Sequence, residues 1–119
     1  MTETKTYTGS CHCGSVRFEV KTELKNAISC NCSICSRAGH LLTFVPADQF
    51  TLLSGEEQLN DYQFKSKRIH HFFCKTCGIR SFGRGTGREG KPVAYINVRC
   101  LEGVDPDSLS IQKFDGRSL

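Results

Sequence analysis

Seven of the eight cysteines in this chain fall into three short clusters. The clusters are Cys11-x-Cys13, Cys30-x-Cys32-x-x-Cys35 and Cys74-x-x-Cys77. Cysteines so close in sequence can direct their sulfurs at one metal ion, and a structural zinc ion takes four ligands in a tetrahedron. Seven clustered thiols therefore predict one zinc site with four cysteines and a second zinc site with only three.

The two outer clusters have the same design. Glycine follows the second cysteine in both, as Cys13-Gly14 and Cys77-Gly78. A chain that folds tightly around a metal often needs a positive φ, which glycine adopts at little cost. We expect Cys11 and Cys13 to lie in extended backbone at the start of a hairpin, where alternate side chains share a face. The four outer cysteines are thus predicted to hold a structural zinc, which contributes on the order of 10 kcal/mol to folding.

The middle cluster supplies three ligands, and the residues leave two interpretations of equal weight. In one, the site is structural and a further side chain closes it. The candidates for that ligand are Cys100, His12, His40, His70 and His71, although only one of the adjacent pair His70 and His71 can face inward from a strand. In the other interpretation, the fourth position stays open for a ligand from outside the protein.

An open site with three thiolates favours sulfur chemistry. Zinc with three thiolates carries a net charge of −1, so it is a weak Lewis acid and hydrolysis is disfavoured. Such an ion suits an incoming thiol, because it lowers the thiol pKa from about 8.5 and presents the nucleophilic thiolate. The expected chemistry is addition of a thiol to an electrophile such as an aldehyde, or the reverse cleavage of a C–S bond.

Composition favours a single small metal-reinforced domain. The length of 119 residues predicts one domain over 1–119. The formal charge of +4 treats thiols as neutral; seven thiolates and two zinc ions change it by −3, which leaves about +1. Nucleic-acid binding is therefore not supported by charge. The first residues lack an apolar stretch and no apolar run could span a membrane, so we expect a cytoplasmic protein whose cysteines bind metal rather than form disulfides.

The elements that must position these cysteines are mainly β-strands. Val16, Phe18 and Val20 alternate with polar residues, the pattern of a half-buried strand. Further strands are predicted over 41–45, 51–53, 62–64, 69–73 and 93–98, and a single helical turn over 33–37. The glycine-rich segment 83–90 is predicted to be a loop. After Cys100, a turn at 105–107 leads to a short edge strand that contains Leu109, Ile111 and Phe114.

The three motifs together resemble a known family. Gly9-Ser10-Cys11-His12-Cys13-Gly14, Cys30-Asn31-Cys32-Ser33-Ile34-Cys35 and His71-Phe72-Phe73-Cys74-Lys75-Thr76-Cys77-Gly78 are similar to the glutathione-dependent formaldehyde-activating enzymes, also called the centromere protein V family. The resemblance covers about residues 5–104. It implies twisted antiparallel sheets like those of the Rab accessory exchange factors.

The same resemblance implies two zinc ions with different roles. The ion at Cys11, Cys13, Cys74 and Cys77 would be structural, and the ion at Cys30, Cys32 and Cys35 would serve glutathione chemistry. The implied activity is that of a carbon–sulfur lyase, which joins glutathione and formaldehyde as S-(hydroxymethyl)glutathione and separates them again. Because glutathione carries two carboxylates, a cationic rim would help it to dock. For each of Arg37, Arg80, Arg84, Arg88 and Arg99 the alternative is solvated surface charge, and we select Arg37 and Arg99 as the candidate contacts.

Two other function classes compete with the lyase. The first is a zinc-stabilised interaction module without turnover, in which both metals are structural. It predicts that Cys35→Ser and Cys77→Ser disrupt folding equally. The second is thiol redox work by the Cys74-x-x-Cys77 pair. It is disfavoured because such pairs usually begin a helix, whereas the flanks here are predicted to be strands.

Overall fold

The computed structural model describes residues 4–63, 69–87 and 90–116. Within these ranges the chain forms ten β-strands, one single-turn α-helix and four 3-10 turns. In chain order the strands and the helix are β1 (Lys5–Ser10), β2 (Arg17–Thr22), β3 (Asn26–Cys30), α1 (Cys35–Ala38), β4 (Leu42–Pro46), β5 (Phe50–Ser54), β6 (Leu59–Tyr62), β7 (Ile69–Cys74), β8 (Phe82–Thr86), β9 (Pro92–Asn97) and β10 (Ser110–Phe114). The 3-10 turns η1 to η4 span Ala47–Gln49, Glu56–Gln58, Val98–Cys100 and Pro106–Ser108. The predicted mainly β fold is confirmed.

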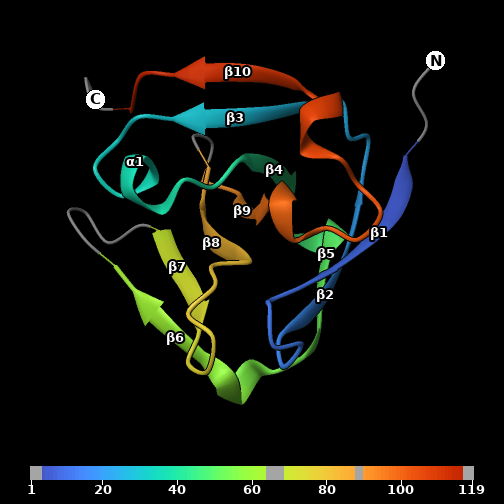
Figure 1. Ribbon diagram of the computed structural model, residues 1–119, viewed down its shortest axis with the longest axis vertical. Coiled ribbons are helices and arrows are strands. Elements are labelled where there is room, and N and C mark those ends of the chain that lie inside the picture. The colour runs from blue at the N-terminus through green and yellow to red at the C-terminus, as the bar shows by residue number, and fades with distance from the viewer. Residues whose placement is uncertain (1–3, 64–68, 88–89, 117–119) are drawn as a thin grey trace.

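The strands form two sheets (Figure 1). β1, β2 and β5 make a three-stranded sheet, and the other strands make a seven-stranded sheet in the order β10-β3-β4-β9-β8-β7-β6. Paired strands run antiparallel, as predicted, except for β10 and β3, which are parallel. The prediction of purely antiparallel sheets is wrong for this pair. Parallel neighbours need a long connection, and here most of the chain lies between the two strands.

Phenylalanine side chains join the two sheets. The ring centroid of Phe50 on β5 lies 5.5 Å from Phe18 on β2 and 4.6 Å from Phe82 on β8. Phe72 on β7 extends the contact, 5.2 Å from Phe82. Phe18 and Phe82 are almost completely buried. Because each buried aromatic side chain removes roughly 150–250 Å² from water, these contacts are a main source of stability between the sheets.

Most predicted strands match the observed ones. Val16, Phe18 and Val20 are each 0% exposed, which confirms the alternation at the start of β2. Strands β4, β5, β7 and β9 overlap the segments predicted over 41–45, 51–53, 69–73 and 93–98, and α1 overlaps the predicted helical turn. The strand predicted over 62–64 is misplaced, because β6 ends at Tyr62; Phe64 lies outside the described residues. No helix within the described ranges is long and apolar enough to cross a membrane.

The glycine-rich segment 83–90 is not simply a loop, because it begins as strand β8. This strand pairs with β7 on one side and β9 on the other. The turn comes later, where the Gly87 N–H donates to the Lys91 carbonyl at 2.8 Å. A Cβ atom on Gly83 would lie 1.9 Å from Cε2 of Tyr95 on β9. Glycine at this position therefore makes room for a neighbouring ring, which local turn preferences do not reveal.

The C-terminal strand β10 braces the segment that carries Cys30. It follows the turn predicted at 105–107 and lies at the edge of the larger sheet, as predicted. Phe114 pairs with Cys30, the last residue of β3, and its carbonyl accepts from the Asn31 N–H at 3.1 Å. The Asn31 side-chain amide also donates to Asp115 Oδ1 at 2.9 Å. The end of β3 is thus held from the C-terminal side of the chain.

Candidate metal centres and an adjoining cavity

The four outer cysteines meet in one place. The sulfur atoms of Cys11, Cys13, Cys74 and Cys77 all lie within 4.8 Å of one another. Cys13 Sγ is 3.6 Å from both Cys11 Sγ and Cys74 Sγ. Four sulfurs at 2.3 Å from a tetrahedral zinc ion would be roughly 3.8 Å apart. The arrangement therefore fits a zinc ion, although its two halves are 61 residues apart in the chain.

Two tight turns direct these sulfurs inward. The Gly14 N–H donates to the Cys11 carbonyl at 3.3 Å, and the Gly78 N–H donates to the Cys74 carbonyl at 2.8 Å. Both glycines have positive φ, 82° and 77°, as predicted. The expectation of extended backbone from Cys11 to Cys13 is wrong, because these residues belong to the turn between β1 and β2. The curvature of that turn, rather than strand alternation, brings the two sulfurs together.

The protein environment splits the acidities of the clustered thiols. Burial raises the pKa of the Cys11 thiol to about 11, with a further rise from its cysteine neighbours. Hydrogen bonding to the Ser15 hydroxyl and backbone N–H lowers the pKa of the exposed Cys13 thiol to about 6. Adjacent thiolates repel one another in a partly buried site, so a cation is the group that would allow all four to ionise. The donor set therefore fits a metal on chemical grounds as well as by distance.

The second cluster lies where β3 leads into α1. Cys30 ends β3 and Cys35 begins α1, and the sulfur atoms of Cys30, Cys32 and Cys35 lie within 4.8 Å of one another. The Cys32 N–H donates to Cys30 Sγ at 3.4 Å, and the Cys35 N–H donates to Cys32 Sγ at 3.5 Å. Hydrogen bonds from backbone N–H groups favour the charged form of a thiol. This cluster is also arranged to share one metal ion.

A small core separate from the main one supports the second cluster. Buried Cys35 packs with Leu42 on β4 and Tyr95 on β9, and Ile34 packs against them. Burial raises the pKa of Cys35, and the neighbouring thiols raise it further. For Cys32, burial opposes ionisation, but hydrogen bonds from the backbone and side chain of Cys35 outweigh it and lower the pKa. The three thiols therefore occupy unlike environments within one cluster.

His40 lies directly against this cluster. Its Nε2 is 3.2 Å from Cys35 Sγ, and its ring packs edge-on to Tyr95 at 5.9 Å. Burial, together with the nearby charges of His71 and Arg80, lowers the pKa of His40 to about 4. The ring is therefore neutral at pH 7 and can donate one N–H to the sulfur of Cys35. On the far side of Tyr95, the hydroxyl is 2.6 Å from Nδ1 of His71.

The five residues predicted as candidates for the fourth ligand of the second cluster lie in different parts of the structure. Cys100 packs against the main core, which also contains Cys11 and Cys74 of the first cluster. Burial, together with the charges of Cys11 and Cys77, raises the pKa of Cys100 to about 11. His12 is exposed, and His70 pairs with Asp61 at 2.6 Å. One member of the His70–His71 pair is buried, as predicted; it is His71, which faces Tyr95. Only His40 among these five contacts the cluster, and it stands outside the set of donor atoms that are mutually close.

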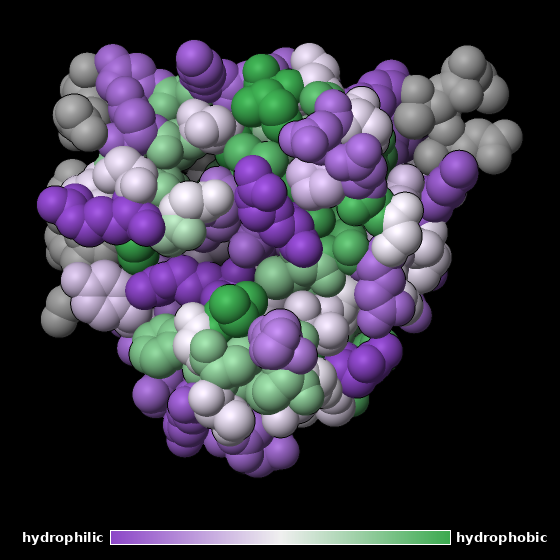
Figure 2. Space-filling view, viewed as in Figure 1, coloured by the Kyte–Doolittle hydropathy of each residue, from purple (hydrophilic) through white to green (hydrophobic). Residues whose placement is uncertain are grey.

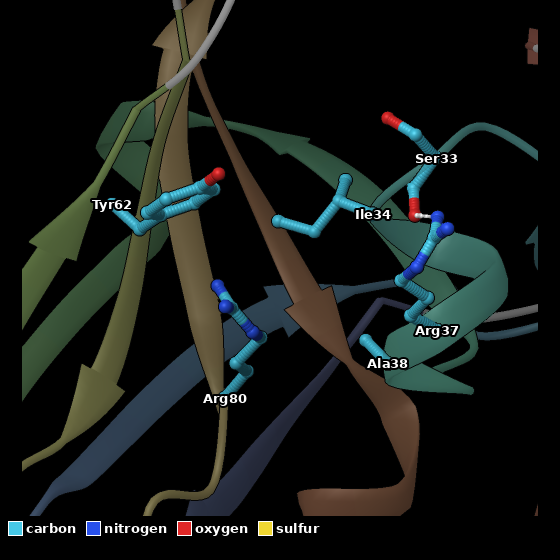
Figure 3. Close-up of a pocket in the computed structure, with 6 residues that line it drawn as sticks. All are labelled: Ser33, Ile34, Arg37, Ala38, Tyr62 and Arg80. Atoms are coloured by element: carbon cyan, nitrogen blue, oxygen red, sulfur yellow. Dashed lines mark hydrogen bonds between the residues drawn. The ribbon is translucent and has the colours of Figure 1, made fainter.

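A cavity of about 490 Å³ adjoins the second cluster. The residues that line it are Ser33, Ile34, Arg37, Ala38, Tyr62 and Arg80. Figure 3 shows the Arg80 side chain projecting between Tyr62 on one side and the α1 residues on the other. The wall formed by Ser33 and Ile34 is the chain between Cys32 and Cys35, so the cavity and the cluster share a boundary. Figure 2 shows a hollow bordered by hydrophilic side chains on this face.

Of the two arginines selected from the sequence, Arg37 lines the cavity. Its Nη1 donates to the Ser33 carbonyl at 2.8 Å. Arg99 is exposed on η3 and is not among the described residues at the cavity. Arg80, which was not selected from the sequence, lines the cavity together with Arg37. The sequence signal that could have identified Arg80 is its position three residues after Cys77, where the chain leaves the first cluster.

Comparison with known proteins gives a consistent result. A family model described as "Glutathione-dependent formaldehyde-activating enzyme" (GFA) matches residues 6–112. A Penicillium rubens relative named "Putative glutathione-dependent formaldehyde-activating enzyme" is 32% identical over 80 residues, or 62% of this chain and 41% of the relative. This chain thus matches less than half the length of that relative. The crystal structure of a Rhodobacter sphaeroides protein has a TM-score of 0.77 at 33% identity and covers 88% of this chain and 99% of its own. The chain therefore belongs to the glutathione-dependent formaldehyde-activating enzyme family.

Proposed function

We propose that this protein is a zinc-dependent carbon–sulfur lyase that acts on adducts of glutathione and an aldehyde, such as S-(hydroxymethyl)glutathione. The observation that carries the proposal is a group of three cysteine sulfurs, with no fourth among the mutually close donors of the described residues, beside a cavity lined by arginine. Membership of the family supports glutathione and formaldehyde as the reactants. The proposal treats residues 1–119 as one domain with two zinc ions and the fold of the Rab accessory exchange factors.

The two clusters would have different tasks. Cys11, Cys13, Cys74 and Cys77 would hold a structural zinc that joins the turn after β1 to the turn after β7. Cys30, Cys32 and Cys35 would hold the second zinc with a position left for the substrate sulfur. When bound there, zinc lowers the pKa of an incoming thiol and so favours the thiolate at neutral pH.

The described residues would prepare this reaction in specific ways. The backbone N–H groups of Cys32 and Cys35 and the ring of His40 point at cluster sulfurs, which stabilises their negative charge. The side chains of Leu42 and Tyr95 exclude water from the inner side of the cluster. Arg37 lies at the cavity, where a glutathione carboxylate would be attracted, and Arg99 remains the second proposed contact.

The proposed reaction balances without an oxidant or a reductant. In the forward direction, the thiolate sulfur attacks the aldehyde carbon and a C–S bond forms. The C=O π electrons move to the oxygen, which takes a proton, so the proton lost by the thiol ends on the new hydroxyl. In the reverse direction, the hydroxyl proton leaves, the C=O bond reforms, and the sulfur departs with the electrons of the C–S bond.

Cobalt substitution tests the open site directly. Cobalt in place of zinc gives absorption bands that report its thiolate ligands, and added glutathione should change them as a fourth sulfur binds. S-Methylglutathione is the matched control, because its blocked sulfur lacks an ionisable thiol and should leave the bands nearly unchanged. Unaltered bands at saturating glutathione would refute the open site and with it the lyase proposal.

A further inference from the structure

Arg80 is an unusually well-fixed cation in the wall of the cavity. Its Cζ lies 5.7 Å from the ring centroid of Tyr62 and 5.5 Å from that of Phe73, so aromatic faces hold the guanidinium group. The Asn97 side-chain amide donates to the Arg80 carbonyl at 3.0 Å, and the Asn97 N–H donates to the next carbonyl, that of Ser81, at 2.9 Å. Both the backbone and the side chain are therefore positioned before any ligand arrives.

Within the described residues, one donor of the Arg80 guanidinium group lacks a polar partner. Nη1 is buried and makes no hydrogen bond, and none of the ion pairs in the described part of the chain includes Arg80. A buried donor on a charged group is costly to leave unpaired, whereas an anionic acceptor turns that cost into a strong interaction. A surface arginine held only by water would not have this geometry.

The position of Arg80 connects it to the second cluster. Ser33 and Ile34, the two residues between Cys32 and Cys35, line the same cavity as Arg80. Cys32 and Ile34 also pack against the small core that contains Cys35 and Tyr95, so the cavity wall is continuous with the cluster. Arg37 lines the same cavity from α1, so two cations share one space of about 490 Å³. That volume is within the range of about 300–1,000 Å³ typical of sites for small molecules.

We propose that Arg80 is the carboxylate anchor of this cavity and binds a carboxylate of the thiol substrate whose sulfur reaches Cys30, Cys32 and Cys35. The assignment takes the thiol from the proposed function, but the anchor itself rests on the geometry of Arg80. A planar guanidinium group can donate two parallel hydrogen bonds to one carboxylate, which gives direction as well as affinity. Recognition of the substrate would then depend on a carboxylate remote from the reacting sulfur.

The test uses S-methylglutathione, which keeps both carboxylates but has no free thiol. Its binding to the metal-loaded protein can be measured by calorimetry for the wild type, Arg80→Gln and Arg84→Gln. Arg84 is the matched control, because it also lies over two aromatic rings, Phe50 at 5.3 Å and Phe82 at 5.7 Å, but does not line this cavity. Arg80→Gln should weaken binding on the order of ten- to a hundredfold, and Arg84→Gln less than about threefold.

Changes in the ligand keep the test decisive if a variant folds poorly. Each of the two carboxylates of S-methylglutathione can be amidated in turn. Amidation of the carboxylate that Arg80 binds should weaken binding to the wild type as much as Arg80→Gln does, and amidation of the other carboxylate should weaken binding less. No binding of S-methylglutathione to the wild type, or equal losses for Arg80→Gln and Arg84→Gln, would overturn the anchor. If S-methylglutathione binds through Arg80 but glutathione leaves the cobalt spectrum unchanged, the lyase proposal fails and the anchor stands.

Discussion

Loss of one ligand from each cysteine cluster should affect folding to different extents. Cys77→Ser and Cys32→Ser form the best comparison, because both cysteines are half-buried and the cost of the new hydroxyl is similar. Cys35→Ser, which the sequence alone suggests for the second cluster, is less suitable because Cys35 is buried. Comparison of Cys77→Ser with Cys32→Ser therefore separates the stability lost with each metal ion from the cost of placing a hydroxyl at a buried position.

The expected difference in stability between the two variants follows from the length of chain that each metal would close into a loop. The first cluster joins positions 61 residues apart, whereas the second lies within residues 30–35. The entropy of loop closure grows as (3/2)RT ln n, so the longer link stabilises the folded state by about 2 kcal/mol more. For a chain of 119 residues this corresponds to a difference of roughly 10 °C in Tm.

Thermal unfolding with metal analysis provides the assay. Cys77→Ser should have a Tm about 10 °C below that of Cys32→Ser, and Cys32→Ser should lose one metal per chain while it keeps the folded circular dichroism spectrum. Equal losses of Tm would refute the reasoning and support the alternative in which both ions are structural and the protein is an interaction module. A lower Tm for Cys32→Ser would have the same consequence.

Two further predictions concern packing and protonation. Gly83→Ala should lower the free energy of unfolding by about 1–3 kcal/mol, because its Cβ would lie 1.9 Å from a Tyr95 ring carbon. Measured by urea unfolding, the same substitution in a Tyr95→Leu background should cost less than half as much. Equal losses in the two backgrounds would contradict the packing argument. Burial lowers the pKa of His71, with a further contribution from Arg80, so the unfolded chain binds this proton more readily. The stability contributed by neutral His71 is complete above its ordinary pKa of about 6.5 and is lost as pH falls through that value toward the folded pKa. Between pH 7 and 5 the wild type should therefore lose stability more steeply than His71→Gln, by up to about 1.4 kcal/mol per pH unit, and parallel curves would contradict the shift.

The parts of the fold that follow local rules could be predicted from the sequence. Val16, Phe18 and Val20 alternate with polar neighbours and are all buried. The cysteine spacing also groups the thiols as the structure does. Gly83 shows where local rules fail, because its reason is the Tyr95 ring on another strand rather than a turn. The parallel pairing of β10 with β3 likewise depends on a contact between distant segments.

The cavity could be predicted only in part. Arg37 follows the second cluster closely in sequence, and α1 keeps it at the cavity. Arg80 carries no local feature that separates it from Arg84, because both lie in similar polar and glycine-containing surroundings. Arg80 differs from Arg84 because it lines the cavity, where Tyr62 from β6 and Phe73 from β7 contact its guanidinium group only after the larger sheet has formed.

The contact of β10 with the end of β3 has a practical consequence for handling this protein. A Cβ atom on Gly116 would lie 2.6 Å from Cys30 Sγ, so bulk added here would press on a thiol of the second cluster. Bulk attached directly after Gly116 would therefore start close to the proposed reaction centre, whereas β1 begins on the opposite side (Figure 1). N-terminal tags, or complete cleavage of C-terminal ones, should therefore precede any measurement of metal content or turnover.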